Sequence, residues 1–275
     1  MALTIRSTVK LNNGVEMPLF GLGVWQIPSG RAAHQAVSVA LQTGYRLIDT
    51  AKFYGNEADV GAAVRESGVP RDEVFITTKL WNDDHGFDPA LKAFEASRKR
   101  LGFPTVDLYL IHWPVPRERR ETWRALERIL KEGSVRAVGV SNYTIPHLEE
   151  LLSSSGVVPA VNQVELSPFL AQKPLIEFCR KHGIAVEAYS PLTKGHRLGD
   201  RRLKAVATKY GKSVPQILIR WGLQQGIIEI PKSAKPDHIK ENAAVFDFEI
   251  RPDDMRAIDS LSEDLHVAWD PTGEP

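Results

Sequence analysis

This chain alternates regularly between short apolar runs and longer amphipathic stretches, and that rhythm constrains its fold more than any other feature. The runs are rich in β-branched and aliphatic residues, as strands buried on both faces are. Strands that alternate with helices form a parallel sheet covered by those helices. The eight runs predicted as strands are FGLGVW, YRLIDTA, VFITTKL, VDLYLIHW, VRAVGVSN, AVNQVEL, IAVEAYS and IIEIPKS.

Eight strand–helix units favour a closed (β/α)8 barrel, the TIM barrel of the α/β class, over an open doubly wound sheet. No linker, low-complexity segment or change of composition divides the chain, so we expect a single domain over residues 1–275. Amphipathic patterns predict helices over residues 32–43, 57–67, 89–101, 119–131, 145–152, 173–182, 201–210 with 214–223, 236–245 and 252–261.

The first segment has a different pattern, which is typical of a β-hairpin. Residues 4–10 and 15–17 flank the sequence Asn12-Asn13-Gly14. Asn-Gly suits a tight type I′ turn, because both central residues of that turn have positive φ. We therefore predict an N-terminal hairpin with a type I′ turn.

The bulk composition excludes several classes of partner. A formal net charge of +1 gives no reason to expect nucleic acid or an acidic membrane surface. The basic run Arg117–Arg120 is broken by Glu118 and precedes a predicted helix, as a solvated helix start would. No signal peptide or membrane span is evident. Cys179 is the only cysteine and lies on an apolar helix face, which predicts a buried, inert thiol and a cytoplasmic protein.

Polar side chains gather at the carboxyl ends of the predicted strands, which is the end where parallel barrels place their chemistry. Each strand is apolar and then turns polar at its last residues, and stability alone does not require this pattern. The strand-end residues are Asp49, Lys79, His112 with Trp113, Ser141 with Asn142, Asn162 with Gln163 and Glu165, Tyr189 with Ser190, and Lys232 with Ser233.

Four of the titratable residues can act together as acid–base machinery. Asp49 and Lys79 end neighbouring strands, so they can form a shielded ion pair. A lysine beside a phenol favours the phenolate, so we expect Lys79 to lower the pKa of Tyr54 toward neutrality, where the phenol can donate a proton. His112 can hydrogen-bond a substrate oxygen. Taken singly, the ion pair can also be structural, and Tyr54 can be a packing residue.

Other chemistries fit the residues less well. The eight histidines are scattered, with no i,i+4 pair and none beside a cysteine at ligand spacing, so we expect no metal, although Asp49, Glu57 and Glu165 remain an alternative set of carboxylate ligands. No G-x-S-x-G elbow is present. Gly21-Leu22-Gly23 resembles the start of a dinucleotide fingerprint, but Gln26 stands at the third glycine position and no helix opens there.

Taken together, the sequence resembles the aldo-keto reductase superfamily, most closely its prokaryotic members similar to 2,5-diketo-D-gluconate reductases. The matching segments follow the family order over nearly the whole chain, and GYRLIDTAKFYGNE and IPKS…P..I.EN are the most specific. The remaining segments are MPLFGLGVW, LYLIHWP, VGVSNY, VNQVELSPF and AYSPL.

The resemblance implies a (β/α)8 barrel whose amino end, the bottom, is closed by the hairpin. It also implies a cytoplasmic, monomeric enzyme that reduces aldehydes, ketones or keto-sugars to alcohols with NADPH. In this sequence the family's proton donor falls on Tyr54, its tuning lysine on Lys79, the ion-pair partner on Asp49 and the substrate-orienting histidine on His112.

A cofactor site and an aromatic pocket are implied as well. Ser141, Asn142 and Gln163 would hold the nicotinamide carboxamide, and the ring would stack on Tyr189. The remaining cofactor positions are Gly23, Val24 and Trp25, then Ser190, Pro191 and Leu192 along the pyrophosphate, and Lys232, Ser233, His238, Glu241 and Asn242 at the adenosine end. Trp25, Trp81 and Trp113 would line the substrate pocket, with Trp269 as a fourth aromatic residue.

Three features depart from the family pattern. His238 replaces an arginine that usually grips the 2′-phosphate, so we expect NADPH to be preferred but NADH to be tolerated, with Lys235 in partial compensation. Lys52 replaces a small residue, and either reaches into solvent or favours anionic substrates. The loop after Leu192 and the C-terminal arm are both short, which predicts a looser cofactor clamp and an open pocket.

Two competing functions remain at this stage. One is a non-catalytic relative that binds the cofactor as a redox sensor or structural subunit, against which the complete set of four residues argues. The other is an isomerase or aldolase in which Lys79 forms a Schiff base. A lysine paired with Asp49 would be charged, and a charged amine is a poor nucleophile.

Overall fold

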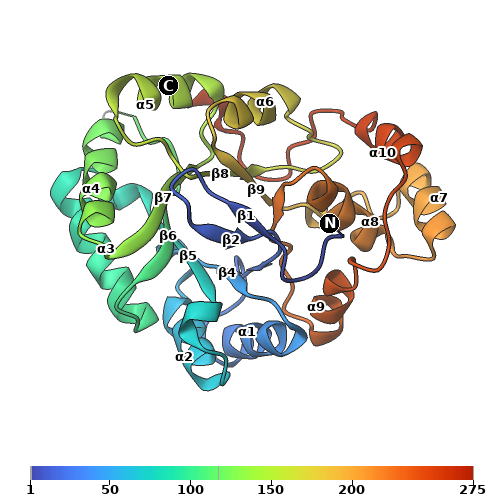
Figure 1. Cartoon of the computed structure of the whole chain (residues 1–275), viewed down its shortest axis with the longest axis horizontal. Coiled ribbons are helices and arrows are strands. Elements are labelled where there is room, and N and C mark those ends of the chain that lie inside the picture. Colours follow the sequence, from blue (N-terminus) through green and yellow to red (C-terminus); the bar gives the residue numbers. More distant parts are fainter. Residues whose placement is uncertain (1, 117, 275) are drawn as a thin grey trace.

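The computed structural model describes residues 2–116 and 118–274, so Arg117 of the basic run lies outside the described residues. Eight parallel strands form one sheet in the order β10-β9-β8-β7-β6-β5-β4-β3. The two end strands also meet, because Phe20 bridges Glu229 and Gly23 bridges Lys232 in parallel. The sheet therefore closes into the predicted barrel, and helices surround it (Figure 1).

The predicted elements are confirmed, with strands generally shorter than the apolar runs and helix ends within two residues of their expected bounds. The barrel strands are β3 (Leu22–Gly23), β4 (Leu47–Asp49), β5 (Phe75–Leu80), β6 (Val106–Ile111), β7 (Val135–Ser141), β8 (Val161–Glu165), β9 (Ala185–Tyr189) and β10 (Ile228–Glu229). The helices are α1 (Arg31–Thr43), α2 (Glu57–Glu66), α3 (Phe87–Leu101), α4 (Arg119–Lys131), α5 (Ile145–Ser154), α6 (Lys173–Lys181), α7 (Arg201–Tyr210), α8 (Val214–Gln224), α9 (Pro236–Ala243) and α10 (Pro252–Asp259).

Local sequence sets where several helices begin. At the start of α8, Ser213 and Gln216 form a capping box, in which Gln216 Oε1 accepts from the Ser213 backbone N–H at 2.9 Å. This capping box satisfies N–H groups that the first helical turn leaves unpaired. Thr144 and His147 form the same arrangement at α5. These two motifs are local sequence signals that fix where α5 and α8 begin.

The Gly21-Leu22-Gly23 run lies at the seam of the barrel and not in a glycine-rich loop that opens a helix. A Cβ atom at Gly23 would lie 2.9 Å from the Ile230 carbonyl oxygen, and one at Gly21 would lie 2.4 Å from the Leu47 side chain. Glycine is therefore needed because the backbone closes tightly there. This packing explains the two glycines without any dinucleotide fingerprint.

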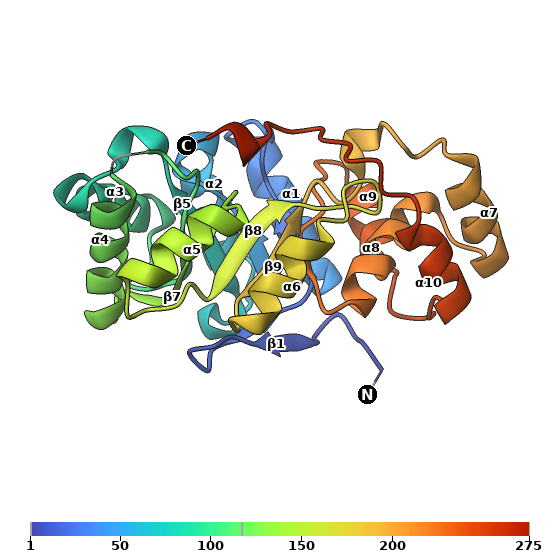
Figure 2. The ribbon, with the colours of Figure 1, turned by 90° about the horizontal axis from the view of Figure 1, so that it is seen from above.

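The N-terminal hairpin consists of β1 (Thr8–Lys10) and β2 (Glu16–Pro18), which pair antiparallel. It lies across the end of the barrel opposite the C-terminal arm (Figure 2). The hairpin is confirmed, but the predicted type I′ turn is wrong. Gly14 has a φ of +88°, whereas Asn13 has no positive φ, and the Gly14 N–H donates to the Leu11 carbonyl. The loop is thus a longer one that needs a left-handed residue only at Gly14.

Two expectations from composition can be compared with the structure. Cys179 is buried on α6, and burial raises the pKa of its thiol to about 11, as expected of an inert thiol. Among the described residues, no helix is long and apolar enough to cross a membrane.

Glu229 on β10 is a fully buried carboxyl group. It lies against Gly222 of α8, and neither of its oxygens has a hydrogen-bond partner among the described residues. Burial raises its pKa well above the ordinary value of 4.5, so Glu229 holds a proton in the folded protein at neutral pH.

This proton makes stability depend on pH. Because the unfolded chain releases the Glu229 proton above about pH 4.5 while the native state keeps it, unfolding becomes easier as the pH rises through that range. We expect Glu229→Gln, which cannot ionise, to raise Tm relative to the parent by an amount that grows from pH 5 to pH 8. Thermal unfolding by circular dichroism measures this, with Glu177→Gln, a change to an exposed glutamate on α6, as control. A difference in Tm between Glu229→Gln and the parent that does not change with pH would contradict the assignment of a protonated Glu229.

Candidate active site

A cavity of about 700 Å³ opens at the carboxyl ends of the barrel strands. Asp49, Tyr54 and His112 line it, and Lys79 is fully buried behind them. Most of the predicted strand-end residues therefore converge on one cavity, while Asn162, Glu165 and Ser233 do not line it. Other predicted residues that line it are Gly23, Trp25, Trp81, Trp113, Ser141, Asn142, Gln163, Tyr189, Ser190, Pro191, Leu192, Lys232 and Trp269.

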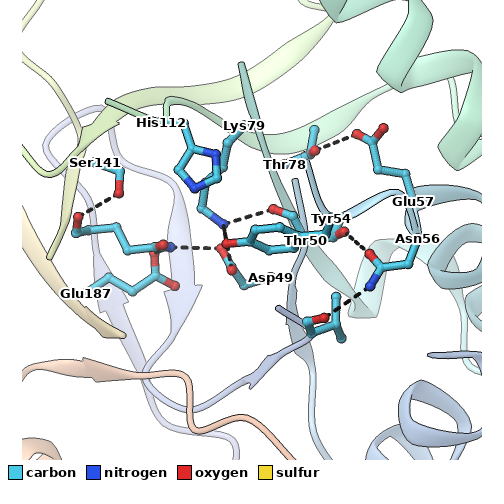
Figure 3. Close-up of polar contacts among 12 residues, drawn as sticks. Asp49, Thr50, Tyr54, Asn56, Glu57, Thr78, Lys79, His112, Ser141 and Glu187 are labelled. Atoms are coloured by element: carbon cyan, nitrogen blue, oxygen red, sulfur yellow. Dashed lines mark hydrogen bonds and ion pairs between the residues drawn. The ribbon is translucent and has the colours of Figure 1, made fainter. Parts of the chain in front are cut away.

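The Lys79 ammonium group organises the centre of this site. Its Nζ donates to Asp49 Oδ1 at 2.7 Å, to the Thr50 carbonyl oxygen at 2.9 Å and to the Tyr54 hydroxyl oxygen at 3.2 Å (Figure 3). An ammonium group has three N–H donors, so all of them are used. The Tyr54 oxygen accepts one of these bonds, which leaves the hydroxyl proton of Tyr54 free to be donated to another group.

The predicted fall in the pKa of Tyr54 is wrong. Burial raises this pKa well above its ordinary value of 10, and Asp49, together with Glu187 once it ionises at alkaline pH, raises it further. Lys79 favours the phenolate, but its charge is already offset by Asp49 and cannot outweigh the loss of solvation. The phenol is therefore fully protonated at neutral pH, which is the form that a proton donor requires.

His112 completes the group at the end of β6. Burial and the positive charge of Lys79 lower its pKa well below 6.5, so the imidazole is neutral at pH 7. A neutral imidazole carries one N–H and can donate one hydrogen bond without adding charge. Its ring packs edge-on against Tyr54 at 5.7 Å and against Trp81 at 5.2 Å between ring centroids, which fixes its plane.

A second buried carboxyl group, which we did not predict, lies beside the ion pair. Glu187 on β9 is fully buried, and Gln163 Nε2 donates both to Glu187 Oε2 and to Asp49 Oδ2, each at 2.8 Å. Burial and the charge of Asp49 raise the pKa of Glu187 to about 8. Burial also raises the pKa of Asp49, but the charge and hydrogen bond of Lys79 oppose that rise. Among the described residues, Glu187 has no such cationic partner at hydrogen-bond distance, so it is the member of the pair that keeps a proton at neutral pH.

Several residues that line the cavity have left-handed backbone conformations. Gln26, Asn142, Ser190 and Lys194 have φ values of 58°, 64°, 52° and 49°. Such conformations are costly for residues other than glycine, and they tend to occur at functional sites. The Asn142 amide is held firmly, because it donates to the His112 carbonyl at 2.9 Å and accepts from the Tyr189 hydroxyl at 2.8 Å.

Aromatic side chains form the mouth of the cavity. Trp113 packs on Trp269 of the C-terminal arm with ring centroids 5.0 Å apart. Phe53, which we did not single out, stacks on Trp81 at 3.8 Å and is 53% exposed. The cavity mouth thus has two aromatic pairs in addition to Trp25.

The C-terminal arm, residues 262–274, crosses the top of the barrel (Figure 2). Glu165 at the end of β8 holds it by accepting from the backbone N–H groups of Val267 at 2.7 Å and Ala268 at 3.0 Å. Lys194, from the short loop after Leu192, lies over the Trp25 ring at 4.8 Å and donates to the Val267 carbonyl. The loop and the arm are therefore joined over the cavity.

Some predicted residues lie away from the cavity lining. Lys52 pairs with Asp84, so its charge is neutralised there. No group of three or more His, Cys, Asp or Glu side chains in the described ranges could hold a metal ion. The predicted cofactor residues outside the lining are Val24, which is buried, and Ser233, His238, Glu241 and Asn242, which lie on or just before α9.

Comparison with known proteins agrees with this architecture. The model of the aldo/keto reductase family matches residues 20–263, and the chain belongs to that family. Glyoxal reductase of Bacillus subtilis (strain 168) is 50% identical over 271 residues, which cover 98% of each chain. An aldo/keto reductase structure from Brucella melitensis has 51% identity and a TM-score of 0.90, covering 93% of this chain and 99% of that one. A Bombyx mori aldo-keto reductase in complex with NADP has 36% identity and a TM-score of 0.90, covering 98% and 96%.

Proposed function

We propose that this chain is a single-domain, monomeric carbonyl reductase that uses NADPH and protonates its substrate from Tyr54. When bound, the nicotinamide supplies a hydride to the carbonyl carbon. Tyr54 donates its proton to the carbonyl oxygen, and neutral His112 orients that oxygen by a hydrogen bond. The observation that carries this proposal is the hydrogen bond from Lys79 to the Tyr54 oxygen, because it leaves the phenolic proton available to the substrate.

The residues of the cavity fit a nicotinamide cofactor. Ser141, Asn142 and Gln163 bring amide and hydroxyl groups to one wall, and Tyr189 offers a half-buried ring for stacking. The backbone of Ser190 is already in a strained conformation beside them. An aldo-keto reductase from Bombyx mori has been solved in complex with NADP, and another aldo-keto reductase in complex with NADPH, which supports the same cofactor here.

The Schiff-base alternative has little support from this geometry. Lys79 has no exposed surface, and three acceptors occupy its ammonium group. A nucleophilic lysine must be deprotonated and within reach of a carbonyl carbon. Carbonyl reduction uses the same lysine in its charged form and requires no such change.

The substrate class that we propose is small aldehydes and α-dicarbonyls, with keto-sugars as further candidates. The high identity to glyoxal reductase and the resemblance to diketo-gluconate reductases support this choice. The test follows NADPH absorbance at 340 nm with methylglyoxal, nitrobenzaldehyde and 2,5-diketo-D-gluconate as substrates. We expect reduction of all three, with different kcat/KM values. No NADPH oxidation with any of them would count against the proposed function.

The preference for NADPH over NADH tests the role that we propose for His238. This side chain is exposed on α9, and Lys232 and Lys235 are exposed nearby. An imidazole lacks the planar fork of N–H donors with which an arginine holds a 2′-phosphate through two hydrogen bonds. We therefore expect NADPH to be preferred over NADH, but with a selectivity about 10- to 150-fold lower than an arginine at this position would give. This range corresponds to the loss of one charged hydrogen bond, which is worth about 1.5–3 kcal/mol.

The measurement compares kcat/KM for NADPH and NADH in the parent and in His238→Arg. We expect the variant to gain selectivity for NADPH and to leave the rate with NADH nearly unchanged. Asp237→Asn, the neighbouring change, is the control for a general effect of charge at α9. Equal selectivity in the parent and in His238→Arg would show that position 238 does not contact the 2′-phosphate.

A further inference from the structure

Glu187 is fully buried beside the active site, yet none of the steps proposed above uses it. It lies in the middle of β9, directly opposite Gln163 in the ladder between β8 and β9. Neighbouring residues at the same level of a parallel ladder point to the same face of the sheet. Glu187 and Gln163 therefore both point into the barrel, where Gln163 reaches the cavity lining.

The Gln163 side chain is held by two acidic groups at one end. Its single amide nitrogen donates to Asp49 Oδ2 and to Glu187 Oε2, each at 2.8 Å. An amide NH2 group has only two donors, so both are used. The group that remains for a ligand is the carbonyl oxygen Oε1 of Gln163.

The two acidic partners have different effects on this amide. Asp49 forms an ion pair with Lys79, and its carboxylate would repel the carbonyl oxygen of Gln163. The NH2 group of Gln163 therefore faces Asp49, and its carbonyl oxygen faces away. One hydrogen bond still allows the amide to rotate about that bond. A second bond from the same nitrogen to Glu187 fixes the amide plane, because both N–H groups lie in it.

Burial also suits Glu187 to this task. The carboxyl group is mostly protonated at neutral pH because burial and Asp49 raise its pKa to about 8. It therefore accepts a hydrogen bond from Gln163 without placing a second negative charge beside Asp49. An ionised group at this position would be costly to bury.

We propose that Glu187 is a positioning residue that fixes the amide plane of Gln163, so that Gln163 Oε1 accepts a hydrogen bond from the carboxamide NH2 of the nicotinamide. This inference rests on the proposed function, since it assumes that the nicotinamide binds beside Gln163. It assigns Glu187 a role in cofactor orientation and none in the proton transfer itself.

The test compares NADPH with its reduced 3-acetylpyridine analogue, in which a methyl group replaces the carboxamide NH2 and cannot donate. Quenching of tryptophan fluorescence gives Kd for each ligand. We expect the parent protein to bind NADPH about tenfold more tightly than the analogue, as the loss of one hydrogen bond predicts. In Glu187→Leu, which has no acceptor, this ratio should fall close to one. Glu187→Gln keeps an acceptor oxygen, so it should retain most of the discrimination.

Two further variants keep the test decisive. Glu187→Thr is too short to reach Gln163 and provides a second truncation if the leucine variant does not fold. Glu229→Gln changes another fully buried glutamate, one strand away and facing α8, and should leave both Kd values unchanged. An unchanged ratio in the truncation variants, or no discrimination in the parent, would overturn the role of Glu187. Failure of the parent to bind NADPH at all would instead overturn the proposed function.

Discussion

Replacement of Tyr54 by phenylalanine is expected to lower kcat/KM for carbonyl reduction by about a thousandfold, within the range of ~10²–10⁴ that general acid catalysis contributes. The variant loses the proton that would neutralise the developing alkoxide, while the ring and its edge-on contact with His112 remain. NADPH binding should therefore be retained. Steady-state kinetics with methylglyoxal and a fluorescence titration of NADPH measure the two effects separately.

Tyr109→Phe is the matched control for this experiment. Tyr109 is a fully buried tyrosine on β6 that packs against Phe94 of α3, and its hydroxyl has no partner among the described residues. Its removal should leave both kcat/KM and NADPH affinity within about twofold of the parent, which is a small effect on a free-energy scale. Near-parental activity in Tyr54→Phe would refute Tyr54 as the proton donor.

Replacement of Lys79 by methionine should have two large effects. It removes the hydrogen bond that orients Tyr54, and it leaves Asp49 buried without its 2.7 Å partner. Breaking a buried ion pair on one side costs about 3–5 kcal/mol of unfolding free energy. We therefore expect kcat/KM for carbonyl reduction to fall at least as far as in Tyr54→Phe. We also expect a lower midpoint of urea unfolding.

The double variant Asp49→Asn with Lys79→Met separates stability from catalysis. It removes both charges, so most of the lost unfolding free energy should return. Activity should stay low, because no ammonium group then faces the Tyr54 oxygen. A double variant as unstable as Lys79→Met alone would show that the unpaired charge of Asp49 is not the source of the instability.

Most of the fold could be predicted because its signals are local. The eight apolar runs mark buried strands, and the amphipathic patterns between them mark the helices. The predicted type I′ turn of the hairpin was wrong, because Asn-Gly occurs in more than one type of turn. Only the register of the two flanking strands selects between these types. At that turn the pairing of Leu11 with Val15 leaves only Gly14 in a left-handed conformation.

The site was predictable only where one rule applied. The strand-end rule located Asp49, Lys79 and His112, but Glu187 sits mid-strand and escapes a rule that considers last residues. The rise of the Tyr54 pKa comes from burial first and then from Asp49 and Glu187, which only the closed barrel brings close to the phenol. The ion pair between Lys52 and Asp84 likewise forms between two segments that are distant in the sequence, so it could not be predicted from the residues around Lys52.

The anchoring of the C-terminal arm has a consequence for how this enzyme could diversify. Glu165 binds the arm through main-chain N–H groups at Val267 and Ala268, which every residue except proline provides. These two hydrogen bonds therefore do not depend on which side chains stand at positions 267 and 268. Mutations can change residues such as Trp269, and with them the shape presented to incoming molecules, while the arm keeps its path. Substrate range could thus drift over generations without disturbing the residues that carry out the reaction.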